Sequence, residues 1–285
     1  MKLVLVSDTH LTPRAPAFGD NWTVVRAWIE AMAPDVVVNL GDIAADGASD
    51  PRELHDARAA FDGLGTEVRF IPGNHDIGDN PIEPGAPNDH PLDPRRLADY
   101  RRLYGPDRWS LEWGPWQIVA LNAQLFGTGT DEEGAQFAWL EERLRDRRGP
   151  LGLLLHKPLF RNAPGDTEAH VRYVPAGARR RLLAGLAARD LRFVASGHVH
   201  QARRLRVDGI DHVWVPSTAY CMPDAMQERI GEKLVGILTL EIGDAGHRFE
   251  SVTPAGLLRH NILDHPAVYA KLAAVRAKLG AEAAL

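Results

Sequence analysis

The chain has 285 residues, 45% of them hydrophobic and 25% charged, which is typical of a globular protein with a sizeable core. Its formal net charge of -5 at pH 7 argues against a protein that binds mainly nucleic acid. Its single cysteine, Cys221, excludes an intramolecular disulfide and a thiolate metal cage, and no apolar run has the length of a membrane span. We therefore expect a cytoplasmic protein without a membrane contact.

Apolar runs typical of strands alternate with amphipathic helical patterns from residue 2 to residue 195. Strands are predicted at residues 2–6, 36–39, 68–71, 151–155 and 191–195. Helices are predicted at residues 21–33, 51–64, 94–104, 133–148 and 176–189. This alternation predicts a largely parallel sheet with helices packed outside it.

The pattern changes after Gly197, where strands follow one another without a helix between them. Residues 202–207, 212–216 and 234–242 predict strands joined by short turns. We expect these strands to complete a second, mixed sheet packed on the first. The main domain is expected to span residues 1–256, and residues 257–285 are expected to form a C-terminal helical extension. A homodimer, in which a partner would supply this extension, is left open.

One long segment, residues 77–94, contains five prolines and has neither a helical nor a strand period. A loop of this length inside a compact domain is usually functional or mobile. A second irregular stretch covers residues 158–175. We expect both segments to overhang the functional site and to contribute to the choice of substrate.

Five short polar motifs each follow a predicted strand. They are Asp8-Thr9-His10, Gly41-Asp42, Gly73-Asn74-His75-Asp76, His156 and Gly197-His198-Val199-His200. Each is weak alone, because Asp and His are common in loops, Gly-Asp usually makes a turn, and a single histidine often caps a strand end. The carboxyl ends of strands in an open α/β sheet line one crevice, so these motifs converge there. Together they predict a polynuclear metal site.

The order and spacing of the five motifs resemble those of the calcineurin-like metallophosphoesterases, whose pattern is Asp-x-His, Gly-Asp, Gly-Asn-His-Asp/Glu, His and Gly-His-x-His. The resemblance covers residues 2–200. It is closest to the branch that contains the class III cyclic-nucleotide phosphodiesterases and bacterial glycerophosphodiesterases. It implies an α/β fold with four α/β/β/α layers, in which two mixed sheets are flanked by helices and two metals lie at the mouth of the sandwich.

The resemblance also implies a role for each residue of the motifs. Its ligand set for one metal is Asp8, His10, Asp42 and His200, and for the other Asn74, His156 and His198, with Asp42 bridging. Imidazole and oxygen ligands without sulfur suit Mn, Fe, Zn or Co. Two such divalent ions lower the pKa of a bridging water, and the resulting hydroxide attacks phosphorus. His75, beside Asn74 but outside the ligand set, is the expected general acid, with Asp76 or Asp46 to orient its ring.

Three classes of function remain open. The favoured one is a phosphodiesterase acting on a small phosphoester substrate, of the cyclic-nucleotide or glycerophosphodiester type. The second is another hydrolase with the same site: a phosphomonoesterase, a nucleotide pyrophosphatase or a nuclease. The third is a non-enzymatic binding module, which the intact motifs and His75 disfavour. Arg14 and Arg161, each shortly after a motif, are candidate phosphate contacts, and His90 and His170 are candidate substrate contacts.

Overall fold

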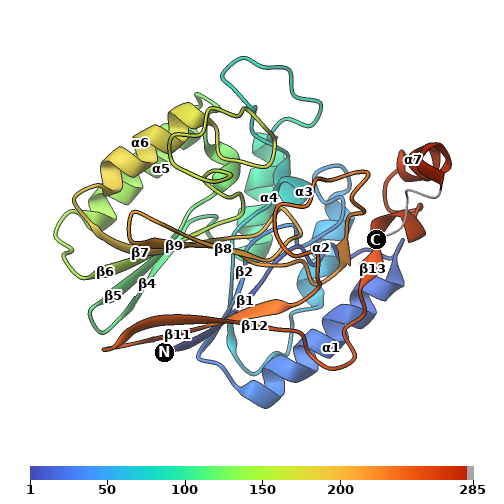
Figure 1. Ribbon diagram of the computed structural model, residues 1–285, viewed down its shortest axis with the longest axis horizontal. Coiled ribbons are helices and arrows are strands. Elements are labelled where there is room, and N and C mark those ends of the chain that lie inside the picture. The colour runs from blue at the N-terminus through green and yellow to red at the C-terminus, as the bar shows by residue number, and fades with distance from the viewer. Residues whose placement is uncertain (281–285) are drawn as a thin grey trace.

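Two sheets lie face to face in the computed structural model, which describes residues 1–280 (Figure 1). The first sheet has the strand order β12-β11-β1-β2-β3. Its strands are β1 (Lys2–Val6), β2 (Val36–Asn39), β3 (Glu67–Phe70), β11 (Ile237–Gly243) and β12 (Gly246–Val252). The first three are parallel, whereas β11 pairs antiparallel with both β1 and β12, so the sheet is mixed.

The second sheet has the order β4-β5-β6-β7-β9-β8. Its strands are β4 (Trp109–Trp113), β5 (Trp116–Ala120), β6 (Pro150–Leu155), β7 (Asp190–Ser196), β8 (Arg203–Val207) and β9 (Ile210–Trp214). The four central strands are parallel, and the edge strands β4 and β8 are antiparallel to their neighbours. A separate two-stranded sheet joins β10 (Tyr220–Cys221) to β13 (His260–Asn261).

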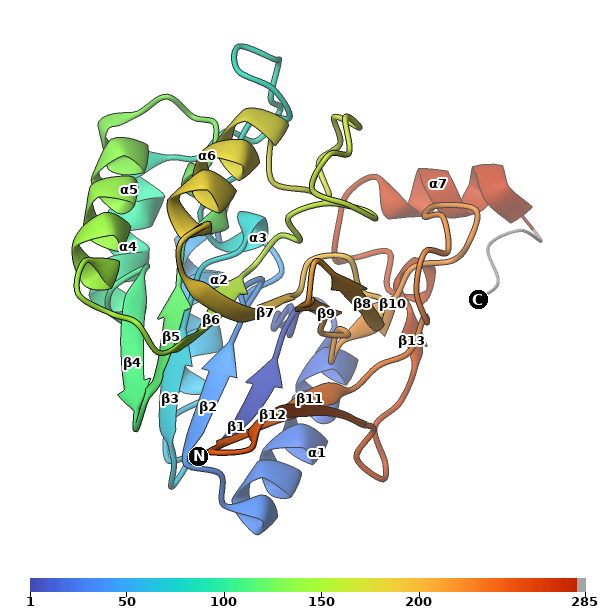
Figure 2. The same ribbon diagram turned by 60° about the vertical axis from the view of Figure 1, so that its left-hand side comes forward.

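Helices cover the outer face of each sheet (Figure 2). The first sheet is covered by α1 (Pro16–Met32), α2 (Pro51–Ala59) and α4 (Pro94–Tyr104), and the second by α5 (Asp131–Leu144) and α6 (Ala176–Leu186). Shorter helical elements are α3 (Asn74–Ile77), η1 (Ala123–Leu125), η2 (Ile262–Asp264) and α7 (Leu272–Leu279). The predicted four-layer α/β/β/α sandwich is confirmed.

The apolar sequence of β1 explains why the strand lies in the middle of these layers. Alternation along a strand sends successive side chains to opposite faces. Leu3 and Leu5 join the core between the two sheets, whereas Val4 and Val6 pack under the helices of the first sheet. Because both faces are buried from Leu3 to Val6, these four residues are apolar, and polar residues follow directly after the strand ends.

The partner of one predicted strand differs from the expectation. Residues 234–242 were expected to complete the second sheet, but the strand there, β11, pairs with β1 in the first. The second sheet already ends in the hairpin of β9 and β8, whereas β1 has β2 on one side only. The period of a strand shows which face is buried but not which edge it joins. Helix α1 also begins earlier than predicted, at Pro16, since proline suits the first turn of a helix.

The C-terminal segment packs against the carboxyl-end side of the molecule. Ile262, Leu263, Val268 and Leu272 are buried together with Phe18 of α1. Residues 281–285 of the predicted extension lie outside the described residues, and the boundary at residue 256 stays a prediction. Within residues 1–280, no helix has both the length and the apolar character needed to cross a membrane.

Candidate metal centre

The structure brings all eight predicted site residues together at the carboxyl ends of five strands, where the arrowheads of β1, β2 and β6 point in Figure 2. Strands β1, β2 and β3 of the first sheet carry Asp8, His10, Asp42, Asn74 and His75, and strands β6 and β7 of the second carry His156, His198 and His200. Both sheets therefore contribute to one site, as the positions of the motifs predicted.

The first group of side chains is Asp8, His10 and His200, all buried. Nε2 of His10 lies 3.1 Å from Nε2 of His200, and Nε2 of His200 lies 3.3 Å from Oδ1 of Asp8. That Asp8 oxygen is buried and has no hydrogen-bond partner among residues 1–280. A buried carboxylate oxygen without a partner is costly, and facing ring nitrogens need a shared proton or a cation between them.

The second group is Asn74, His156 and His198. Nε2 of His156 lies 3.1 Å from Nδ1 of His198 and 3.3 Å from Oδ1 of Asn74. Asp42 lies between the two groups, since its Oδ2 is 3.3 Å from Nε2 of His156 and 3.8 Å from Nε2 of His10. One carboxylate oxygen thus faces both groups at once.

Backbone carbonyls fix the orientation of three of these imidazole rings. His156 donates from Nδ1 to Leu40 O at 2.8 Å, His200 from Nδ1 to Tyr220 O at 3.1 Å, and His198 from Nε2 to Val171 O at 3.1 Å. The other nitrogen of each ring is then left with a lone pair that faces the centre. Histidines that ligate metals typically donate a hydrogen bond from the ring nitrogen that does not bind the metal. The donor set therefore fits divalent cations.

The charges of the site also favour a cation. Burial opposes ionisation of Asp42, but His156 and His75 hold the pKa of this carboxyl well below its usual range. Burial also opposes protonation of His156, yet the Asp42 carboxylate raises the pKa of this imidazole to about 9. The pKa of His10 lies well below its usual value, first because of burial and then because of His75. Without a cation, His156 therefore holds a positive charge beside Asp42, and a metal ion bound there would replace that proton, whereas His10 is already neutral, as a metal ligand must be.

The backbone is strained where the motifs lie. Of the non-glycine residues in the described chain, seven have positive φ, and five of these are Asp8 (53°), His10 (42°), Asp42 (53°), His198 (69°) and His200 (51°). Left-handed backbone costs a non-glycine residue on the order of 1 kcal/mol or more, and such strain is concentrated at functional sites. Hydrogen bonds between the motifs hold it in place, including His10 N to Asp42 O at 3.0 Å and His198 N to Asp8 Oδ2 at 2.9 Å.

Two motif glycines are required by close approach. A Cβ on Gly197 would overlap Oγ of Ser7, and a Cβ on Gly73 would overlap Oδ1 of Asp42. The glycines therefore let the motif loops come close enough for their side chains to share one centre.

His75 lies at the edge of the centre and is only half-buried. Its backbone N–H donates to Oδ1 of Asp42 at 2.8 Å, and its Nδ1 donates to Ala45 O at 2.7 Å. The expectation that Asp76 or Asp46 orients this ring is wrong. Asp76 accepts backbone N–H groups instead, and Asp46 lies 3.6 Å from the Arg14 guanidinium.

Asp76 organises the loops of the site through three hydrogen bonds. Its Oδ1 accepts from Ile43 N at 2.9 Å and Ala44 N at 3.1 Å, and its Oδ2 accepts from Gly73 N at 2.8 Å. Burial and the neighbouring Asp42 nevertheless raise the pKa of Asp76 to about 7.

Two substitutions of Asp76 separate the effect of its hydrogen bonds from the effect of its charge. Asp76→Ala and Asp76→Asn both remove the charge, but the asparagine oxygen can still accept from Ile43 and Ala44. We expect Asp76→Ala to have a free energy of unfolding about 2 to 4 kcal/mol below that of Asp76→Asn, because two more buried N–H groups lose their acceptor. Urea denaturation of the two variants measures the difference, and equal stabilities would contradict this role of Asp76.

The other candidates from the sequence contact residues other than the predicted ligands. Arg14 contacts Glu53 at 2.8 Å, and Arg161 contacts Glu228 at 2.6 Å. His90 is exposed on the first loop, and Nδ1 of His170 accepts from Arg172 N at 3.1 Å. The structure does not bring His90 or His170 into hydrogen-bond contact with the predicted ligands among the described residues.

Two tyrosines and a lysine were missed. The hydroxyl of Tyr269 lies 3.1 Å from Nδ1 of His10, and that of Tyr220 lies 3.5 Å from its Nε2. Lys157 is buried beside the centre and pairs with Asp79 of the loop at residues 77–94. Lys157 follows His156 directly, which is a signal the sequence offered, whereas no motif marks either tyrosine.

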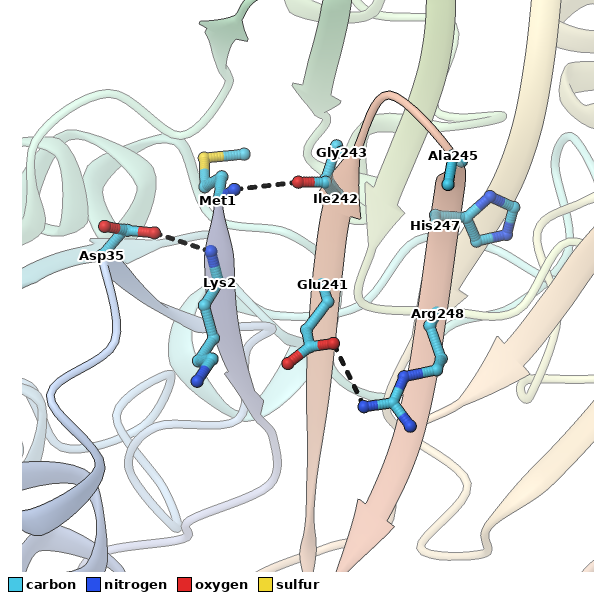
Figure 3. A pocket seen from close by; sticks show the side chains of 10 residues that line it. Met1, Lys2, Asp35, Glu241, Ile242, Gly243, Ala245, His247 and Arg248 are labelled. Carbon is cyan, nitrogen blue, oxygen red and sulfur yellow. Dashed lines mark hydrogen bonds and ion pairs between the residues drawn. The ribbon is translucent and has the colours of Figure 1, made fainter.

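A hollow of about 480 Å³ lies at the amino end of β1, away from the carboxyl ends of the strands (Figure 3). Its polar groups pair with one another, since Lys2 N donates to Asp35 at 2.6 Å and Arg248 donates to Glu241 at 3.1 Å. Among residues 1–280, its lining contains no group of potential metal ligands such as the one described above.

Comparison with known proteins places this geometry in a family. Residues 1–202 match the family described as calcineurin-like phosphoesterase. A probable cyclic nucleotide phosphodiesterase of Psychrobacter sp. (strain PRwf-1) is 25% identical over 206 residues, which are 69% of this chain and 56% of that protein. A second probable cyclic nucleotide phosphodiesterase, of Synechococcus sp., is 28% identical over 220 residues, which are 71% of this chain and 74% of that protein.

A likeness in fold extends further than the likeness in sequence. The crystal structure of a dimetal phosphatase from Danio rerio has a TM-score of 0.59 at 14% identity, covering 90% of this chain and 99% of that one. The family match covers all five motifs and every residue of the two side-chain groups. The chain therefore belongs to the calcineurin-like phosphoesterase family, as the order of its motifs predicted.

Proposed function

We propose that the chain hydrolyses small phosphodiesters at a centre of two divalent metal ions. The observation that carries this proposal is the arrangement of two side-chain groups around a single carboxylate, Asp42, whose Oδ2 faces His10 and His156. The family supports a metal-dependent phosphoester hydrolase, and the names of the two relatives favour a cyclic-nucleotide diester as one substrate.

In this proposal Asp8, His10, Asp42 and His200 hold one ion, and Asn74, His156 and His198 hold the other with Asp42 shared. Nitrogen and oxygen donors without sulfur suit Mn, Fe, Zn or Co. When bound, two such ions would activate water and neutralise charge on the phosphoryl oxygens. The His75 backbone N–H on Oδ1 of Asp42 keeps the other oxygen directed at both groups.

His75 is proposed as the general acid. Its Nδ1 donates to Ala45 O at 2.7 Å, so a second proton on the ring sits on Nε2. The ring is half-buried and lies 4.9 Å, between centroids, from the ring of His10. It can therefore reach a leaving group at the edge of the centre while staying outside both ligand groups, and Nε2 would give the proton to the departing alkoxide.

A diester is favoured over a monoester by the charges near the centre. A phosphomonoester carries a second negative charge that a cationic side chain commonly binds. Both arginines next to the motifs already face carboxylates, Arg14 with Glu53 at 2.8 Å and Arg161 with Glu228 at 2.6 Å. Each guanidinium is thus already paired with a carboxylate of this chain.

A substrate panel tests the proposal. Metal-free protein reconstituted separately with Mn, Fe, Zn and Mg would be assayed on cyclic nucleotides, glycerophosphodiesters and their monoester products. We expect diesters to be cleaved with a kcat/KM at least about tenfold above that of the monoesters, and the metal-free protein to be inactive. A preference for monoesters, or turnover without metal, would overturn the proposal.

The loop at residues 77–94 is proposed to select among diesters. Its base is closed by Asp79 N to His90 O at 2.7 Å and Leu92 N to Asp79 O at 2.9 Å, and Lys157 anchors Asp79 beside His156. Replacing residues 82–87 by two glycines keeps this base, including Asn88, whose side chain donates to Asp79 O at 2.8 Å. We expect the ratio of kcat/KM values between cyclic and glycerol diesters to change at least about fivefold, with unchanged metal content. Unchanged ratios would count against the loop.

A further inference from the structure

One side chain from the C-terminal segment reaches the metal centre, although this segment lies outside the family match at residues 1–202. The hydroxyl of Tyr269 lies 3.1 Å from Nδ1 of His10 and 3.4 Å from Nδ1 of His75. The rings of Tyr269 and His75 are 5.2 Å apart between centroids. One phenol oxygen therefore contacts both a proposed ligand and the proposed general acid.

The position of the ring proton of His10 determines which group donates in the contact between His10 and Tyr269. Nε2 of His10 faces the Asp8 and His200 side, so Nδ1 carries the ring proton when the ring binds a metal. The Tyr269 hydroxyl is the only partner of this Nδ1 that we find in residues 1–280. The phenol oxygen therefore accepts the Nδ1 proton of His10 and so fixes the orientation of this ring. Backbone carbonyls play the same role for His156 and His200.

His75 shares the same acceptor. Its Nδ1 donates mainly to Ala45 O at 2.7 Å. The Tyr269 oxygen, at 3.4 Å, is a second and weaker acceptor of the same proton. Ala45 itself is buried in the cluster that also holds the C-terminal segment. The ring of His75 is thus confined between the loop after β2 and Tyr269.

The segment around Tyr269 is fixed by its own packing. Val268 is fully buried and Leu272 nearly so, in a cluster with Phe18 and Tyr220. Strand β13 pairs in parallel with β10, and Arg276 donates to Leu263 O at 2.9 Å. The backbone around Tyr269 is therefore held in place by packing, which is what a positioning residue requires.

We propose that Tyr269 is a positioning residue of the reaction centre: its hydroxyl fixes the His10 ring for the first metal and confines His75. Residues 260–279 then complete the site. This inference rests on the proposed function, since it assigns Tyr269 to the same two-metal centre. It identifies a determinant of metal affinity that the family match does not cover.

The substitution Tyr269→Phe tests the role, because it keeps the ring and removes only the hydroxyl. Tyr100→Phe is the matched control, since the Tyr100 hydroxyl is buried without a hydrogen-bond partner in the described chain. Metal-free proteins would be titrated with Co²⁺ by calorimetry and visible spectroscopy, and kcat and KM would be measured on a diester.

We expect Tyr269→Phe to bind one of the two ions about 10- to 100-fold more weakly and the other normally, with an altered Co²⁺ spectrum. At saturating metal, kcat should fall while KM changes little, and the metal-free variant should still unfold in one cooperative transition, as Tyr100→Phe does. The role is overturned if Tyr269→Phe has wild-type affinity for both ions and wild-type kcat. If the wild-type chain itself binds no ions, the proposed function is overturned along with it.

Discussion

The substitution Asp42→Ala is expected to remove both metal ions together and to abolish turnover. Asp42 Oδ2 is the one oxygen that faces both groups, 3.3 Å from Nε2 of His156 and 3.8 Å from Nε2 of His10. Its loss leaves one group with a carboxylate and two imidazoles and the other with an amide and two imidazoles. Because several kcal/mol of transition-state stabilisation depend on the ions, kcat/KM should fall at least about 10³-fold.

Metal analysis of the purified variant measures this loss, and Asp46→Ala is a suitable control. Asp46 is also an aspartate beside the site, but it lies 3.6 Å from Arg14 and faces neither group. The control should keep both ions and near-normal turnover. Two tightly held ions in Asp42→Ala would show that Asp42 is not the shared ligand.

The substitution His75→Ala should keep both ions and slow the reaction by an amount that depends on the leaving group. An alkyl or ribosyl alkoxide needs a proton as it departs, so loss of the general acid should lower kcat about 10²- to 10⁴-fold. A nitrophenolate departs readily as an anion, so the same variant should lose much less activity on a nitrophenyl diester.

The comparison of the two substrates in one variant is its own control, since any damage to the fold would affect both. Metal content adds a second check, because His75 lies close enough to His10 and Asp42 to be a ligand by distance alone. Equal losses on both substrates would assign His75 to phosphate positioning, and loss of an ion would assign it to the metal.

The location of the site was predictable because polar residues occur where buried strands end. Strand β1 is apolar from Leu3 to Val6, and Asp8 and His10 follow it at once. The same pattern recurs after β2, β3, β6 and β7, so the direction of the strands sufficed to bring the residues together. The four layers followed from the alternation of strand and helix with the resemblance to a known family.

Features that depend on partners far along the chain were not predictable from local pattern. The pairing of β11 with β1 joins residues more than 230 positions apart, and strand period does not report it. The orientation of His75 by Ala45 O involves a backbone carbonyl, which carries no sequence signature. Tyr269 lies in an ordinary helical pattern, and only the folded chain places its hydroxyl beside His10.

A titration of the metal-free chain with Mn²⁺, in which bound ions and diester hydrolysis are followed together, tests the two-metal account most directly. The account predicts two ions per chain at saturation, with hydrolysis of the diester appearing only as the second ion binds. Saturation at one ion, or full activity before a second ion is bound, would contradict it.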